Sequence, residues 1–195
     1  MIPAFLLILS AVAYRILTTL FVQSDSIGLN NFAPLAAIAL CAAAYFPGKY
    51  KFAVPMLAML LSDVVLNMHY SFSMLSPFVI SHYFAFAIIG CLGLALRGRA
   101  SLKTLLPASI AASLVFYLVT NTVSWLFDPA YAKNLAGFIQ AQTTGHPAWA
   151  ATPTWMFFRN SLVSDLLFTG LFVGCMHLGR STARPRPAEA LPRPA

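Results

Sequence analysis

Six long apolar blocks, separated by short polar or basic connections, dominate the chain and restrict what it can fold into. They cover residues 2–22, 31–46, 51–67, 75–96, 104–127 and 154–179. A helix needs about 20 residues to cross the bilayer hydrocarbon, so the second and third blocks are marginal spans. Only 9% of the residues are charged, whereas soluble domains carry about 25%. We therefore expect an all-α membrane domain over residues 1–180, a bundle of six transmembrane helices.

The basic residues indicate how this bundle is oriented. They gather in two connections and after the last block: Lys49, Lys51, Arg97, Arg99, Lys103, Arg180, Arg184, Arg186 and Arg193. The connections 23–30, 68–74 and 128–153 contain one basic residue, Lys133. The positive-inside rule then predicts a multi-pass protein of the bacterial inner membrane with both termini in the cytoplasm. The formal net charge of +7 is thus a topology signal, and we expect no nucleic-acid partner.

The two ends of the chain and its longest connection allow further expectations. Ala11-Val12-Ala13 resembles a signal-peptide cleavage site, but no basic residue precedes the apolar run, so we expect residues 1–22 to stay as a helix. Residues 181–195, with Arg-Pro and Pro-Ala steps, predict a disordered cytoplasmic tail. The connection 128–153 is either a plain interfacial segment with aromatic anchors or a cover over a site, and the sequence leaves both open.

Charged residues inside apolar blocks are the most informative ones, because an ionised group in a bilayer is costly and usually faces a partner. Arg15, Asp63 and Asp165 all fall at about 18–21 Å from the cytoplasmic ends of their helices, counting 1.5 Å per residue. His82 falls at the same depth, and Asn121 slightly farther out. Two interpretations stay open: a buried ion cluster that fixes helix register, in which either carboxylate neutralises Arg15, or the floor of an outward-opening solute site.

Polar and aromatic residues above this layer are the candidate substrate-binding residues. They are Asn31, Phe32, His69, Tyr70, Ser81, His82, Tyr83, Asn121, Trp125, Arg159 and Asn160. The aromatic ones have an alternative as interfacial belt residues. His82 is either a hydrogen-bonded packing residue or a ligand for a transition metal in a bound cofactor.

Catalytic motifs are missing from the sequence. It has no Walker motif, no paired Glu-x-x-His, no HExxH and no nucleophile elbow. We therefore name no catalytic residue, and a membrane enzyme is the least favoured class unless a bound cofactor brings the chemistry. Cys41, Cys91 and Cys175 lie inside apolar blocks without metal-site spacing, and we expect them to be small buried residues.

Several short motifs carry a resemblance to a known family. They are Asn31-Phe32-Ala33-Pro34-Leu35, Tyr45-Phe46, the segment from Val54 to Asp63, and Phe158-Arg159-Asn160-Ser161-Leu162. Over about residues 10–178 the chain resembles the substrate-binding S-components of energy-coupling-factor (ECF) vitamin transporters, and most closely the solitary BtuM-type cobalamin transporters. The resemblance implies a six-helix bundle that binds a micronutrient from the outer side.

The resemblance also implies partners and a ligand. Many S-components dock on a shared coupling module through an Ala-x-x-x-Ala face of the first helix, but Ala4, Ala11 and Ala13 lack that spacing. This departure favours a solitary mode over an ECF coupling module. BtuM-type proteins are associated with a cysteine that ligates the corrin cobalt. No cysteine here lies at that depth, so His82 is the candidate cobalt ligand.

Together these observations predict an inner-membrane vitamin uptake protein without an intrinsic cofactor. Cobalamin or a related corrinoid is the first substrate hypothesis, and membrane lipid is the surrounding partner. The alternatives are a transporter of another vitamin or precursor, such as thiamine or a queuosine precursor, and a membrane assembly protein that transports nothing.

Overall fold

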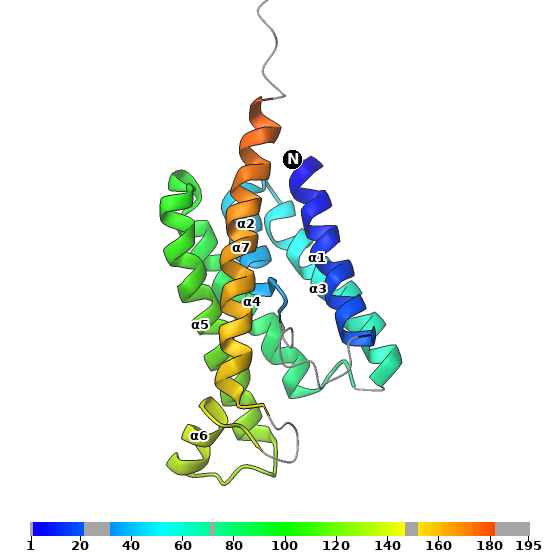
Figure 1. Cartoon of the computed structure of the whole chain (residues 1–195), viewed down its shortest axis with the longest axis vertical. Helices are drawn as coiled ribbons and strands as arrows, with labels where there is room; N and C mark the ends of the chain where they lie inside the picture. Colours follow the sequence, from blue (N-terminus) through cyan, green and yellow to red (C-terminus); the bar gives the residue numbers. More distant parts are fainter. Residues whose placement is uncertain (1, 22–31, 71–72, 147–151, 182–195) are drawn as a thin grey trace, which may run out of the picture.

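The computed structural model describes residues 2–21, 32–70, 73–146 and 152–181, and these are almost entirely helical (Figure 1). The helices are α1 (Ile2–Phe21), α2 (Leu35–Tyr45), α3 (Tyr50–Tyr70), α4 (Pro77–Ala95), the 3-10 turn η1 (Arg97–Arg99), α5 (Leu102–Phe127), α6 (Leu135–Gln142) and α7 (Thr154–Ser181). Each of the six apolar blocks corresponds to one of the helices α1, α2, α3, α4, α5 and α7. The all-α fold is thereby confirmed, and α6 is an addition within the connection 128–153.

Four of these helices, α3, α4, α5 and α7, are long and apolar enough to cross a membrane. Large apolar side chains cover their outer surfaces, as at Leu57, Phe84 and Leu171, which are 55%, 60% and 57% exposed. Soluble monomers seldom expose apolar area on this scale. The chain is therefore embedded in a membrane.

Helix α2 is the centre of the bundle although it is its shortest apolar helix. Its 11 residues include nine that are buried, and they belong to both apolar cores of the bundle, with Ala37 in one and Ala36 in the other. It spans about 16 Å at 1.5 Å per residue, so it begins well inside the bundle. Alanines let the surrounding helices approach closely. At Gly93 of α4, an added Cβ would lie 2.4 Å from the Leu40 carbonyl oxygen.

The helix ends fall into two groups (Figure 1). The start of α1, the α2–α3 turn, the α4–α5 connection with η1, and the end of α7 lie at one end, which we call the basic end because Lys49, Arg97 and Arg99 lie there. Gly48 forms the α2–α3 turn with a φ of +52°, which favours glycine. Helix α6 lies at the opposite end. The tail 182–195 lies outside the described residues.

Candidate functional site

Arg15 of α1 and Asp63 of α3 form a buried ion pair. Arg15 Nη2 lies 3.0 Å from Asp63 Oδ1, and the two side chains are only 14% and 8% exposed. Arg15 also donates to the Ser62 hydroxyl, and the Tyr83 hydroxyl of α4 donates to Asp63 Oδ2 over 3.2 Å. The pair thus ties α1, α3 and α4 together and satisfies both charges inside an apolar bundle.

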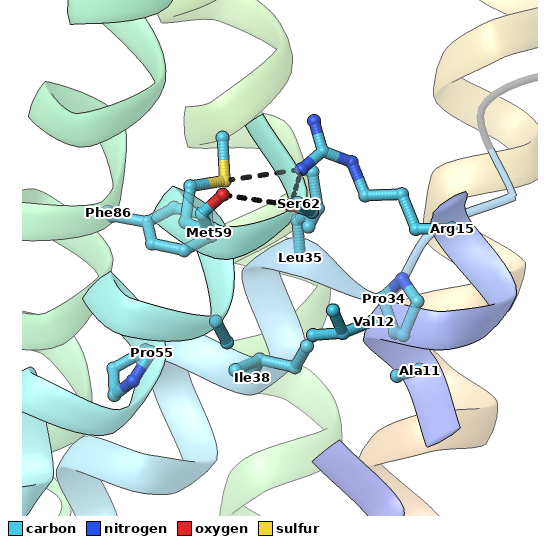
Figure 2. A pocket seen from close by; sticks show the side chains of 11 residues that line it. Ala11, Val12, Arg15, Pro34, Leu35, Ile38, Pro55, Met59, Ser62 and Phe86 are labelled. Atoms are coloured by element: carbon cyan, nitrogen blue, oxygen red, sulfur yellow. Dashed lines mark hydrogen bonds between the residues drawn. The ribbon is translucent and has the colours of Figure 1, made fainter. Parts of the chain in front are cut away.

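A small cavity lies beside this pair (Figure 2). Figure 2 shows the Arg15 side chain extending from α1 across the cavity toward Met59 and Ser62. Pro34 and Leu35, at the start of α2, form another part of its wall. The centre of a water molecule can move within only about 10 Å³ of this cavity, so the cavity has room for about one water. It is not a site for a vitamin-sized solute.

Asp165 of α7, the third charged residue of the layer, has different partners. Its Oδ1 accepts the backbone N–H of Ala37 over 2.9 Å, and its Oδ2 accepts the Ser113 hydroxyl over 2.7 Å. The residue preceding α2, Pro34, provides no side-chain cap. Asp165 therefore supplies from another helix the anion that a helix N-terminus favours. The three charges thus form a pair and a helix cap, and the partner of Arg15 is Asp63.

A cleft of about 320 Å³ opens at the end opposite the basic end. Its walls come from the start of α4, the end of α5, and the connection from α5 to α7: Phe78, Asn121, Ser124, Asp128, Tyr131, Gly145, His146, Thr152, Thr154 and Phe157. Small-molecule sites measure about 300–1,000 Å³ and combine apolar walls with a few polar groups. This cleft meets both criteria, and of the predicted substrate-binding residues it contains Asn121. We refer to it as the outer cleft.

Hydrogen bonds hold the wall of the outer cleft in place. Trp125 Nε1 donates to the Ala132 carbonyl over 2.9 Å, Asn134 caps α6 through the Gly137 N–H, and the Tyr117 hydroxyl donates to the Gln142 carbonyl. Tyr131 is buried in this wall, and burial, together with the negative charge of Asp128, raises its pKa above the usual tyrosine value. Tyr131 is therefore a neutral hydrogen-bonding group at physiological pH.

His82 is stacked on Phe116, with ring centroids 5.5 Å apart. Its Nδ1 is buried and has no hydrogen-bond partner among the described residues. Such an atom is free to accept a hydrogen bond or to bind a metal. However, His82 is not among the residues that line the outer cleft. Within the described residues, no three His, Cys, Asp or Glu side chains lie together as a metal site.

The remaining predicted residues are scattered. Ser81 donates to the Phe78 carbonyl of its own helix, Arg159 donates to its neighbour Asn160, and Phe32 packs edge-on against Tyr14. Asn31 lies outside the described residues, as do the side chains of His69 and Tyr70 at the end of α3. The structure thus joins Arg15, Asp63 and Tyr83 in one cluster and places Asn121 in another.

A second cavity, of about 500 Å³, lies at the basic end. It is formed by Ala44, Tyr45 and the connection from Arg97 to Ser101. Its arginines belong to the set that the positive-inside rule explains by topology. The outer cleft, which combines apolar and polar walls, is the better candidate for solute binding.

The comparison with known protein families identifies the family of this chain. A family model described as "Family of unknown function (DUF6580)" matches residues 1–188. The chain belongs to the DUF6580 family. No curated protein and no solved structure matches it.

In this DUF6580 protein, sequence reasoning missed the polar residues that support the charged layer. Ser113 binds Asp165, and Ser62 binds Arg15. Ser109 and Ser113 are separated by one helical turn in an apolar block, a spacing that places them on the same face. Two sequence features could have indicated the Asp165 site: this spacing of serines, and a proline immediately before α2, which cannot cap that helix with its own side chain.

Proposed function

We propose that this protein is an inner-membrane micronutrient uptake protein, which binds its solute in the outer cleft from the periplasmic side. The observation that carries the proposal is a cleft of about 320 Å³ that opens at the end opposite the basic end. The basic end is the cytoplasmic one by the positive-inside rule, so the outer cleft faces the periplasm. On this proposal each of the six apolar blocks crosses the membrane once, and both termini lie in the cytoplasm.

The buried charges support transport as well. Arg15, Asp63 and Asp165 are costly in a membrane and are typical of proteins that move solutes or ions. Asp63 and Asp165 lie on α3 and α7, which pack against α2, and Arg15 lies on α1, which packs against α3 and α7. Helix α2 itself begins inside the bundle. Broken or short helices that begin at mid-membrane are a recurring feature of transporter sites.

The cleft volume bears on the class of solute. A volume of about 320 Å³ suits a solute the size of thiamine or a queuosine precursor. A corrinoid is several times larger, so cobalamin, which the resemblance to BtuM-type proteins suggests, requires the α5–α7 connection to move outward. His82 would serve as a cobalt ligand only after such a movement, because it does not line the cleft. We therefore rank the smaller vitamins first.

A solitary mode fits the surface of α1 better than docking on an ECF coupling module. Ala4 is fully buried and Ala11 nearly so, and both pack within the bundle. The outward side of α1 instead carries Leu6 and Leu9, which are 58% and 59% exposed. Of the three alanines of α1, only Ala13 is exposed, so this helix presents no Ala-x-x-x-Ala docking face.

The test is calorimetric titration of the purified full chain with thiamine, a queuosine precursor and cobalamin. Ser124→Trp, which fills the outer cleft, is expected to abolish the heat of binding. Leu118→Trp is the matched control, because Leu118 lies on the same helix and is 42% exposed on the outer surface. Binding by wild type and Leu118→Trp but not by Ser124→Trp supports the proposal. No heat from any compound would favour the assembly-protein alternative, and equal heat from all three proteins would contradict the outer cleft as the binding site.

A further inference from the structure

Asp165 is a carboxylate in the centre of the bundle that has no cationic partner among the described residues. It is 2% exposed, and its hydrogen-bond partners are the Ala37 N–H and the Ser113 hydroxyl. Arg15, the nearest candidate counter-ion from the sequence, is paired with Asp63. An ionised carboxylate in such a place is stabilised only by the α2 N-terminus and one hydroxyl, so the ionised and protonated forms are held in closer balance than in water.

Ser113 can serve both of these forms. Its single hydroxyl hydrogen faces two acceptors, Asp165 Oδ2 at 2.7 Å and the Ser109 carbonyl oxygen at 2.9 Å. When Asp165 is ionised, Ser113 donates to it. When Asp165 is protonated, its Oδ2–H donates to Ser113 Oγ, and Ser113 turns its hydrogen to the Ser109 carbonyl. The proton can thus bind and leave without any movement of a heavy atom.

Further buried polar groups lie between this site and the basic end. Thr169 Oγ1 donates to Ser109 Oγ over 3.2 Å, and Cys41 Sγ lies 3.9 Å from Thr169 Oγ1. All three side chains are fully buried. On the other side of Asp165, α7 carries two more buried polar residues, Ser164 and Asn160. Buried polar side chains therefore lie on both sides of Asp165, and those toward the basic end are linked by the contacts given above.

We propose that Asp165 is a proton-binding site which is loaded and unloaded as the protein works. A second step rests on the proposed function: the proton bound by Asp165 drives uptake, entering from the periplasm and leaving to the cytoplasm. Protonation removes the anion at the start of α2, and Pro34 and Leu35 at this start line the cavity beside Arg15. The titratable groups on the helices packed against α7 are Cys41 and Tyr45 on α2, Lys103 and Tyr117 on α5, and Tyr14 and Arg15 on α1.

The test is infrared spectroscopy of the full chain in lipid vesicles as a function of pH. A protonated carboxyl group gives a carbonyl-stretch band that a carboxylate lacks. We expect a band that grows as pH falls, is lost in Asp165→Asn and is retained in the control Arg15→Met/Asp63→Asn, which removes the other buried carboxyl group without leaving Arg15 unpaired. Ser113→Ala keeps the carboxyl group but removes its hydrogen bond, so the band should move to higher frequency. A band that persists in Asp165→Asn, or the lack of any pH-dependent band in wild type, would overturn the proposal.

A second measurement separates this proposal from the proposed function. Accumulation of radiolabelled thiamine is measured in proteoliposomes with and without an acidic exterior. Stimulation by the gradient in wild type but not in Asp165→Asn supports proton-driven uptake, and equal stimulation in both contradicts it. If the infrared band titrates but no thiamine accumulates under either condition, Asp165 still binds a proton and thiamine uptake is refuted.

Discussion

Breaking the Arg15–Asp63 pair should cost far more than replacing it. The two side chains are 14% and 8% exposed, and their charged atoms are 3.0 Å apart. Removing one partner of such a buried pair leaves the other uncompensated, at a cost of about 3–5 kcal/mol. We therefore expect Arg15→Met and Asp63→Asn each to lower the free energy of unfolding by about this amount.

The double variant Arg15→Met/Asp63→Asn leaves neither charge behind, and buried pairs are often replaced at little cost. Its loss of stability should therefore be smaller than the sum of the single losses by about 2 kcal/mol or more, at the upper end of couplings between contacting residues. The assay is reversible unfolding in detergent micelles by a denaturing surfactant, followed by helical circular dichroism. Arg97→Met, an exposed arginine at the basic end, combined with Asp63→Asn is the control and should be additive. Additivity within about 0.5 kcal/mol for the Arg15 cycle would refute the pairing.

Three further outcomes follow from packing, capping and pKa. Gly93→Ala should destabilise the fold by about 1–3 kcal/mol, because the added Cβ meets the Leu40 backbone oxygen. Gly170→Ala, which has open space around it, should instead stabilise the fold by about 0.5–1 kcal/mol. The reverse order of the two variants in unfolding assays would contradict the α2–α4 packing. Ser101→Ala removes a capping box and should lower the free energy of unfolding by about 1 kcal/mol, and no change in the same assay would show that the cap is dispensable. The pKa of Tyr131 is raised, so its contribution to the free energy of unfolding should be present below about pH 10 and lost as the pH rises through its higher pKa in the folded protein. Ultraviolet titration of Tyr131→Phe should show one late-ionising tyrosine fewer than wild type. Identical titration curves for the two proteins would argue against the burial of Tyr131.

The apolar pattern was sufficient to locate the helices because each block has a length and composition that only a buried or lipid-facing helix satisfies. The same pattern could not reveal that α2 begins inside the bundle. Its block, residues 31–46, has the composition of a marginal span, and the position of its first turn depends on Asp165, which lies more than 100 residues away in the sequence. Helix α6 was also missed, because its eight residues depend on the Asn134 cap and on contacts with α5.

Depth counting placed the charged residues in one layer but could not determine which of them meet. Residues at equal depth on different helices are neighbours only if the helices pack in the right order and rotation. The structure pairs Arg15 with Asp63, which lie on contacting helices, and turns Asp165 toward α2 and α5 instead. For the outer cleft, the sequence predicted Asn121, and Ser124 lies about one turn farther along the same helix. Tyr131 and His146 reach the cleft only because of the path that the chain takes after α5.

The most direct test of the account is whether the outer cleft is open to water from outside the cell. Ser124→Cys, in a background with the three native cysteines replaced by alanine, is exposed to a membrane-impermeant maleimide in intact bacteria with a permeabilised outer membrane. We predict labelling of Ser124→Cys and none of Ser101→Cys at the basic end until the inner membrane is also opened. The solute that binds in the calorimetric panel should slow the labelling. Labelling of Ser101→Cys alone in intact cells, or of neither residue even after opening, would contradict a cleft that takes its solute from the periplasm.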